Sequence, residues 1–319
     1  MAQGPPAPPL TPNELIDVLK SKQQRPQAAS IVEQRGVSFE LTPEIEKQLR
    51  KAKADDMLIE TVKKASPSAR AAQAAASGAV VATPEERQDM ATIQNELDPD
   101  RAIQLVKDFE TKYPNSQLLT WAYAYAASHY RQKDDMQHVL EYGDKSLKLK
   151  SDNLISLIIM AQNLPRPQNM KVSEDEKEKI LGKAESYAQE ALKQIAALPK
   201  QPGETDEEFQ RRTTQLTQDM HSALGMVHLQ RSQLALEGLD SDELRKAEQE
   251  YMIAVTGGDA ADPQDFFRLG ETRTLLKNYD GAIEAFSKAS QLGQGTVVKT
   301  YADQRIEAVQ KMKAQAATK

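Results

Sequence analysis

The sequence contains no cysteine and few aromatic residues. Of its 319 residues, one is tryptophan and 5% are aromatic. The lack of cysteine excludes disulfides, thiolate metal sites and a cysteine nucleophile. The longest apolar stretch, LISLIIMA at 154–161, is far shorter than the about 20 residues that a membrane-spanning helix needs. We therefore expect neither cysteine chemistry nor a membrane span.

The chain also lacks an excess of basic residues. Its formal net charge is −6 at pH 7. A general nucleic-acid binder needs a basic face that displaces counterions from phosphate, so we do not expect nucleic acid as the main partner. The hydrophobic fraction of 39% and the charged fraction of 28% are typical of a soluble protein rich in surface helix. The length allows two domains or one extended array.

The N-terminal segment, MAQGPPAPPLTP, has neither a basic start nor an apolar run, so no signal peptide is visible. The sequence as written therefore predicts a cytoplasmic protein. The alternative is a periplasmic or cell-envelope protein whose leader is missing from the sequence, because a proline-rich start directly after Met1 also suits a processed form.

Two low-complexity segments divide the chain. Residues 1–10 are a Pro-rich tail that we expect to be disordered, and residues 66–83, SPSARAAQAAASGAVVAT, read as an Ala/Ser-rich linker. Between them, residues 11–65 are predicted to form a small module of four short helices. Residues 84–294 are predicted to form a helical array, and residues 295–319 a C-terminal capping helix.

The module contains an internal duplication. Its two copies open alike, LTPNELIDVLKSK at 10 and LTPEIEKQLRKAK at 41. Thr11 and Thr42 can cap the two helices, each followed by a proline that fits the first turn. Glu14 completes a capping box in the first copy. Gly36 is predicted to end a helix. Phe39 and Leu41, two positions later, are predicted to pack beneath both copies.

The charge of this module leaves its role open. Residues 11–65 hold ten Lys/Arg and nine Asp/Glu, a net charge of about +1. A helix-turn-helix DNA reader and a docking or packing module are both compatible with this balance.

One pattern of small and large side chains recurs from residue 84 onward. Positions i, i+4 and i+7 share one face of a helix. The sets on such a face are Ala102/Val106/Phe109, Val139/Gly143/Ser146, Ala184/Ala188/Ala191, Ala247/Tyr251/Ala254 and Ala282/Phe286/Ala289. Each of the last four sets is preceded by a helical segment with its own small residue. In chain order these residues are Ala127, Ala161, Gly225 and Gly270. Such alternation is typical of stacked helical repeats, in which no single unit buries its own apolar face.

This region resembles a tetratricopeptide repeat (TPR) array. The last unit carries the family's pattern in Phe266, Leu269, Gly270, Tyr279, Ala282, Phe286 and Ala289, the second in Tyr123, Ala127 and Tyr130, and the first in Ala102, Phe109 and Pro114. The resemblance covers roughly two thirds of the chain. It implies an all-α fold: a TPR-like α-solenoid of about five irregular helical hairpins plus the capping helix, preceded by the four-helix module.

The repeat is irregular. The first residues of the five sets are 37, 45, 63 and 35 residues apart, whereas the family's period is about 34. One group of additional residues forms an inserted loop, LPRPQNMKVSEDEKE at 164–178. This loop runs into a helix that is predicted to be capped by Ser173 with Glu176. The other lies in a long helix that begins at Thr205, with Glu208 as its capping-box partner.

In TPR arrays the first helix of each hairpin lines a concave groove, where partners bind as extended peptides or helices. The family's groove positions correspond here to Trp121, Tyr125, Ser128, Arg131, Ile158, Ile159, Gln162, Ser222, Met226, Leu229, Phe267, Arg268 and Glu271. This set is mostly apolar and lacks the family's arrangement for holding a terminal carboxylate, so an apolar or amphipathic segment is the expected ligand. Alternatively, Ile158 and Ile159 belong to the core, and Trp121 seals the junction between the first two units.

No motif indicates an enzyme. The sequence contains no Gly-rich phosphate loop, HExxH, GxSxG or EF-hand spacing. His221 and His228 lie seven residues apart on a predicted helix, about 10 Å along its axis, which is too far for one metal ion. We therefore expect no catalytic residues, no cofactor and no metal, with a monomer as the default.

Two classes of function remain open. The first is a non-enzymatic scaffold or adaptor that binds a peptide or helical segment of a partner protein in the groove. The second is a regulator whose N-terminal module binds DNA while the array senses a partner. FETKYPNS at 109–116 resembles the end of repeats in bacterial cell-envelope TPR proteins, which favours the exported alternative.

Overall fold

A computed structural model of the chain describes residues 9–67, 69, 82–201, 203–235 and 238–318, with Asp259 described by its backbone alone. Over these residues it contains fifteen α-helices, four short 3₁₀ helices and no strand beyond one isolated β-bridge. The predicted tail at 1–10 and linker at 66–83 lie mostly outside the described residues. By its contacts the chain divides into two compact units, Met1–Pro84 and Glu85–Lys319.

The first unit contains α1 (Pro12–Lys20), η1 (Arg25–Gln27), α2 (Ala28–Arg35), α3 (Pro43–Lys51) and α4 (Asp56–Ala65). The predicted capping box is present, because the Thr11 hydroxyl accepts a hydrogen bond from the Glu14 amide and the Glu14 carboxylate accepts one from the Thr11 amide. Thr42 caps α3 through the amide of Ile45. The start of each copy is therefore determined by residues within one turn of it.

Gly36 ends α2 in a backbone conformation that only glycine adopts readily. Its φ and ψ are 72° and −177°. Its amide donates to the Val32 carbonyl at 2.8 Å, and its carbonyl accepts from the Leu10 amide at 3.0 Å. This turn pairs Leu10 with Val37 in the β-bridge. The core beneath it includes Phe39, and the neighbouring Leu41 packs against that core, as the sequence predicted.

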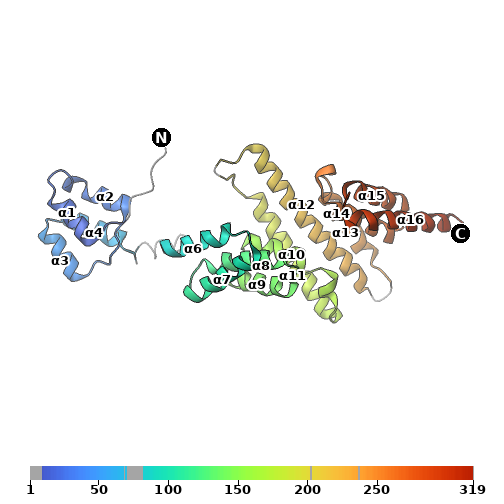
Figure 1. Ribbon diagram of the computed structural model, residues 1–319, viewed down its shortest axis with the longest axis horizontal. Coiled ribbons are helices and arrows are strands. Elements are labelled where there is room, and N and C mark those ends of the chain that lie inside the picture. Colours follow the sequence, from blue (N-terminus) through green and yellow to red (C-terminus); the bar gives the residue numbers. More distant parts are fainter. Residues whose placement is uncertain (1–8, 68, 70–81, 202, 236–237, 319) are drawn as a thin grey trace. The chain divides into compact units, whose positions relative to one another are not determined.

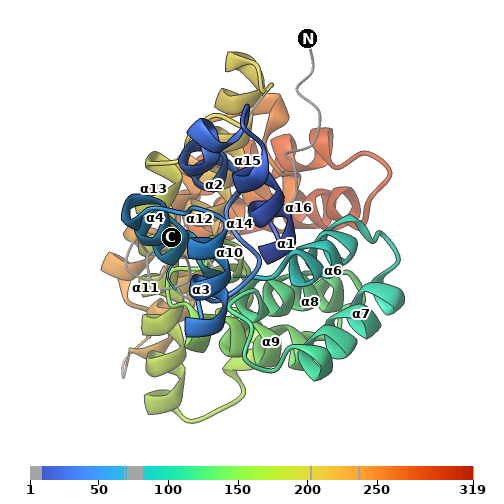
Figure 2. The same cartoon turned by 90° about the vertical axis from the view of Figure 1, so that its left-hand side faces the viewer.

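The second unit is a succession of helices that pack on their neighbours in the chain. They are α6 (Pro84–Asn95), α7 (Pro99–Lys112), α8 (Leu119–Gln132), α9 (Met136–Leu149), α10 (Leu154–Asn163), α11 (Glu174–Ala196), α12 (Asp206–Arg231), α13 (Ser241–Ala254), α14 (Pro263–Leu275), α15 (Tyr279–Leu292) and α16 (Val297–Ala317). From α7 to α16, each helix contacts the next. Figure 1 shows them in chain order, and Figure 2 shows α6, α7, α8 and α9 from another side.

The apolar core of this unit continues from one helix pair to the next. Its clusters draw on α6 to α10, α9 to α12, α12 to α15 and α14 to α16. Every residue of the five small-and-large sets predicted from the sequence is buried. Each helix pair therefore depends on its neighbours to cover its apolar side.

The two predicted irregularities lie where the sequence placed them. After α10 ends at Asn163, a loop with η2 (Pro167–Met170) leads into α11, whose first turn is capped by the Ser173 hydroxyl. The helix α12 is 26 residues long and begins with the predicted capping box of Thr205 and Glu208. In the part of the chain that the structure describes, no helix combines the length and apolar character that crossing a membrane requires.

Candidate functional site

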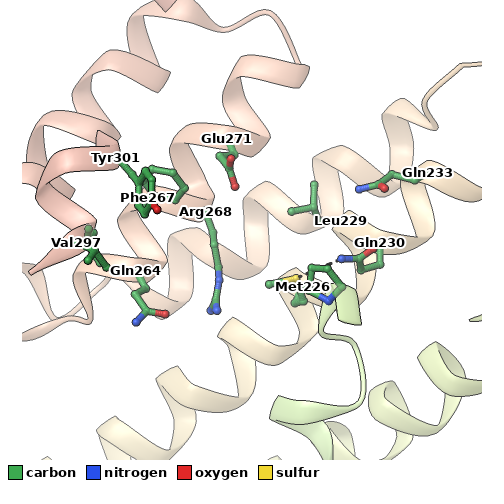
Figure 3. A pocket seen from close by; sticks show the side chains of 12 residues that line it. Met226, Leu229, Gln230, Gln233, Gln264, Phe267, Arg268, Glu271, Val297 and Tyr301 are labelled. Carbon is green, nitrogen blue, oxygen red and sulfur yellow. Dashed lines mark hydrogen bonds between the residues drawn. The ribbon is translucent and has the colours of Figure 1, made fainter. Parts of the chain in front are cut away.

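A pocket of about 450 Å³ lies between α12, α14 and α16 (Figure 3). Its apolar lining consists of Pro167, Met226, Leu229, Phe267, Val297, Val298 and Tyr301, and its polar lining of Gln230, Gln233, Gln264, Arg268 and Glu271. In Figure 3, Phe267 and Tyr301 lie on one side and Leu229 and Met226 on the other, with Arg268 extending between them.

Helical periodicity explains why these side chains meet. On α12 the pocket is lined by Met226 and the residues three and four positions later, and Gln233 follows in η3 (Ser232–Leu234). The α14 side begins with Gln264 and follows the same spacing. Val297 and Tyr301 lie four apart on α16. Residues at these spacings share one helix face, so three helix faces converge on the pocket.

A second pocket, of about 200 Å³, continues the first along α16. The two pockets share Leu229, Gln233 and Glu271, and we call them together the α16 groove. Glu271 accepts a hydrogen bond from Arg305 at 3.0 Å, which joins α14 to α16 across this groove. Apolar side chains on its rim are exposed, among them Tyr301, which is 57% exposed.

Five of the residues predicted for partner binding line this groove. They are Met226, Leu229, Phe267, Arg268 and Glu271. The predicted set contains no residue of the inserted loop or of α16, and the sequence analysis assigned α16 to capping alone. The signal was present in Val297 and Tyr301, two apolar residues four positions apart on the same face of that helix.

The predicted residues on α8 and α10 lie elsewhere. Trp121 and Tyr125 are half-buried against the core of the first helix pairs, and Ile158 is half-buried against the next core cluster. Ser128 is also half-buried. Arg131 donates a hydrogen bond to the side-chain oxygen of Gln162 at 2.9 Å, which connects α8 to α10. The described lining of the α16 groove includes none of these side chains.

Three predicted groove residues are buried, namely Ile159, Ser222 and Leu229, and of these Leu229 still lines the α16 groove. Ile159 is 3% exposed and belongs to the core cluster that contains Tyr123 and Tyr142. Its position in this cluster agrees with the alternative in which it belongs to the core. Ser222 is 8% exposed, and its hydroxyl donates to the Asp265 carboxylate at 2.5 Å. Its side chain therefore serves an internal contact between α12 and α14.

A desolvated carboxyl lies beside the groove. Burial raises the pKa of Asp265 to about 6, although hydrogen bonding from Ser222 and the charge of Arg268 act in the opposite direction. Arg268 also donates to the Ser222 hydroxyl at 3.1 Å and to Asp265 at 3.2 Å. These contacts hold the Arg268 side chain at the edge of the groove.

The two histidines of α12 are used in contacts with α13. The Nδ1 atom of His221 lies 2.6 Å from a Glu250 oxygen, and that of His228 lies 2.7 Å from a Glu243 oxygen. Over the described ranges of the chain, no group of three or more His, Cys, Asp or Glu side chains is arranged to hold a metal ion.

No family model matches the chain. A search of curated proteins likewise gives no significant match. The function is therefore inferred from the geometry of the chain itself.

Proposed function

We propose that the protein is a non-enzymatic scaffold with a TPR-like array that binds an amphipathic segment of a partner protein in the α16 groove. The observation that carries this proposal is the groove itself, two adjoining pockets with a largely apolar lining, an exposed apolar rim and flanking glutamines. Apolar surface that is exposed and bordered by polar side chains marks an interaction site.

The packing of the second unit supports the TPR-like architecture. An aromatic ring of one helix packs directly against a glycine of the preceding helix. Tyr251 packs in this way on Gly225, and Phe286 on Gly270. The core clusters overlap from helix pair to helix pair. Both features belong to solenoids, whose stacked hairpins leave one helix of each pair available for binding.

The shape of the groove favours a protein segment as its occupant. Its two connected parts follow α16 over residues Val297 to Met312, a rise of about 22 Å for a helix. An amphipathic helix of three or four turns matches this length and places anchors at spacings of three, four and seven along one face. Its polar face would then meet solvent beside the glutamines.

Ion pairs in the first unit favour the scaffold over the DNA-binding alternative. Arg50 is bonded to Glu46 at 2.8 Å and to Asp56 at 2.7 Å. Lys20 lies 3.9 Å from Asp17. A surface that binds DNA needs an excess of cations directed toward phosphate, whereas residues 11–65 carry a net charge of only about +1 and Arg50 is held between two carboxylates.

A peptide selection tests the proposal. A library of random 16-residue peptides displayed on phage is selected against the full chain, and enriched peptides are synthesised for fluorescence anisotropy. We expect apolar anchors at helical spacing and a loss of affinity of about tenfold or more in Tyr301→Lys, which introduces a charge into an apolar contact. Leu97→Lys is the control, because Leu97 is 88% exposed and lies on the loop before α7. Equal binding by both variants would contradict the assignment of the groove.

A further inference from the structure

A buried carboxyl lies behind one of the residues that line the α16 groove. The guanidinium of Arg268 donates hydrogen bonds to the Ser222 hydroxyl at 3.1 Å and to the Asp265 carboxylate at 3.2 Å. Ser222 in turn donates to Asp265 at 2.5 Å. Asp265 is 6% exposed, whereas the side chain of Arg268 is 28% exposed. The described lining of the groove includes Arg268 but not Asp265, so Asp265 can affect a bound partner through Arg268.

The position of Arg268 makes this contact relevant to binding. In Figure 3 its side chain extends between the rings of Phe267 and Tyr301 and the opposite wall of the groove on α12. A long arginine side chain loses conformational freedom when it is immobilised, and this loss weakens binding where it occurs during complex formation. A guanidinium that is already bonded to a carboxylate has lost much of that freedom beforehand. The contact with Asp265 therefore orders Arg268 before a partner arrives.

The stability of the fold does not account for a charge at Asp265. Burial raises the pKa of this carboxyl to about 6, although the hydrogen bond from Ser222 and the charge of Arg268 act in the opposite direction. Because this pKa lies above the ordinary value, the charged form of Asp265 lowers the stability of the folded protein at neutral pH. A buried group whose charge costs stability and that lies beside a pocket is a candidate for a functional role.

Charged and titratable groups from several elements surround the contact between Asp265 and Arg268. They are Asp219 on α12, Tyr251 on α13, Asp262 on α14, Arg131 and Asp134 at and after the end of α8, and Arg166 after α10. Over the residues that the structure describes, the hydrogen bonds to the Asp265 carboxylate come from Ser222 and Arg268. Protonation of Asp265 therefore acts most directly on Arg268.

We propose that Asp265 is a positioning residue of the α16 groove, and that uptake of a proton by Asp265 releases Arg268 and weakens the binding of a partner. This inference rests on the proposed function and concerns the regulation of the same site. Below about pH 6 Asp265 is mostly neutral, and a guanidinium bonds more weakly to a neutral acid than to a carboxylate. Arg268 is then less restrained, so part of its loss of freedom occurs during binding. The groove therefore binds its partner more tightly at neutral than at acidic pH.

The restraint on Arg268 can be measured without a partner. The heteronuclear NOE of arginine Nε–H groups is recorded by NMR on the full chain at pH 7.0 and 5.0, and the Arg268 signal is assigned by its loss in Arg268→Met. We expect a high value at pH 7.0 and a lower one at pH 5.0, with low values at both in Asp265→Asn. Asp262→Asn is the matched control, because Asp262 caps the start of the same helix and asparagine keeps that role. An Arg268 signal that is the same in wild type and Asp265→Asn would overturn the inference.

The affinity of a peptide tests the consequence for binding. A peptide selected on the full chain, whose affinity depends on Tyr301, is synthesised with blocked termini and with Asn or Gln in place of its titratable residues. Fluorescence anisotropy measures its affinity at pH 7.0 and 5.0. For the wild type we expect a loss of about three- to tenfold at pH 5.0, and Asp262→Asn should show the same loss. Asp265→Asn should bind weakly at both pH values, and denaturant unfolding checks that each variant is folded.

Arg268→Met separates positioning from a general structural effect. In this background Asp265→Asn has no guanidinium to release, so it should cause no further loss of affinity. An equal loss in both backgrounds would overturn the inference and leave the proposed function intact, as would a wild-type affinity that is unchanged between pH 7.0 and 5.0. Histidine side chains ordinarily titrate in the same range, so a loss at pH 5.0 that persists in Asp265→Asn would also overturn it. If no selected peptide depends on Tyr301, the proposed function fails, and the NMR measurement still decides whether Asp265 restrains Arg268.

Discussion

The ring of Tyr251 in α13 lies directly against the α-carbon of Gly225 in α12. A Cβ atom at Gly225 would lie 2.8 Å from two carbons of that ring, and Tyr251 is fully buried. Phe286 in α15 meets Gly270 in α14 in the same way, with the same 2.8 Å. In two consecutive helix pairs, glycine on the first helix therefore makes room for an aromatic ring of the second.

This contact predicts that Gly225→Ala and Gly270→Ala destabilise the second unit. Overpacking a filled core costs about 1–3 kcal/mol, and the better helix propensity of alanine offsets up to about 1 kcal/mol of that. We expect a net loss of about 1–2 kcal/mol, measured as a lower urea midpoint. Gly182→Ala in α11 is the matched control, because a Cβ there meets nothing within 4 Å, and it should be neutral or slightly stabilising. Similar losses at all three glycines would contradict the packing argument.

Stability should depend on pH through Asp265. Burial raises its pKa from 3.8 to about 6 in the folded protein, so between these values the folded state holds more protons than the unfolded state. Its contribution to stability is therefore most favourable below about pH 4 and is lost as pH rises through about 6. We expect Asp265→Asn to be more stable than wild type at pH 7.5, by up to about 3 kcal/mol, with the difference vanishing near pH 4.

Denaturant unfolding of both proteins from pH 4 to 8 measures this effect. Asp303→Asn provides a control of opposite sign, because the Lys299 ammonium and the Ser290 hydroxyl lower the pKa of Asp303. That variant should lose stability at neutral pH. A constant difference between Asp265→Asn and wild type across the whole range would exclude Asp265 as the titrating group.

Gly36→Ala should weaken the first unit alone. Alanine at a φ of 72° and a ψ of −177° stores about 1–3 kcal/mol of backbone strain. Hydrogen exchange followed by mass spectrometry should show faster exchange in peptides from residues 9–67. Peptides from residues 85–318 are the internal control and should keep wild-type protection, since the two units are separate compact bodies. Faster exchange in both units would show that they unfold together.

Arg231 should stabilise the contact of α12 with α11 and α13. Its guanidinium lies 2.9 Å from Glu185, 3.1 Å from Glu178 and 3.8 Å from Glu243, and its side chain is 18% exposed. Removing it leaves the partly buried Glu185 without a cation, while Glu243 keeps Lys246 at 2.6 Å, so we expect Arg231→Met to lose about 2 kcal/mol in urea unfolding. Arg245→Met breaks the exposed pair with Asp242 and should change stability by less than about 0.5 kcal/mol.

Much of the fold was predictable because its signals are local. The caps at Thr11, Thr42, Ser173 and Thr205 each involve residues within one turn of the helix start. The small-and-large sets follow from helical periodicity, and all their members are buried. The candidate site was predictable only in part. Adjacent residues such as Ile158 and Ile159 have different exposures that depend on the angle at which neighbouring helices pack.

The sequence by itself determined where helices begin, where they end and which face of each is apolar, because these properties depend on contacts between residues less than about two turns apart. Only the tertiary structure decided which of those faces stay open. It bonded Ser222 to Asp265 across 43 residues of chain, and it completed the α16 groove with Tyr301. Such contacts depend on how successive helices stack, and no short stretch of sequence encodes that geometry.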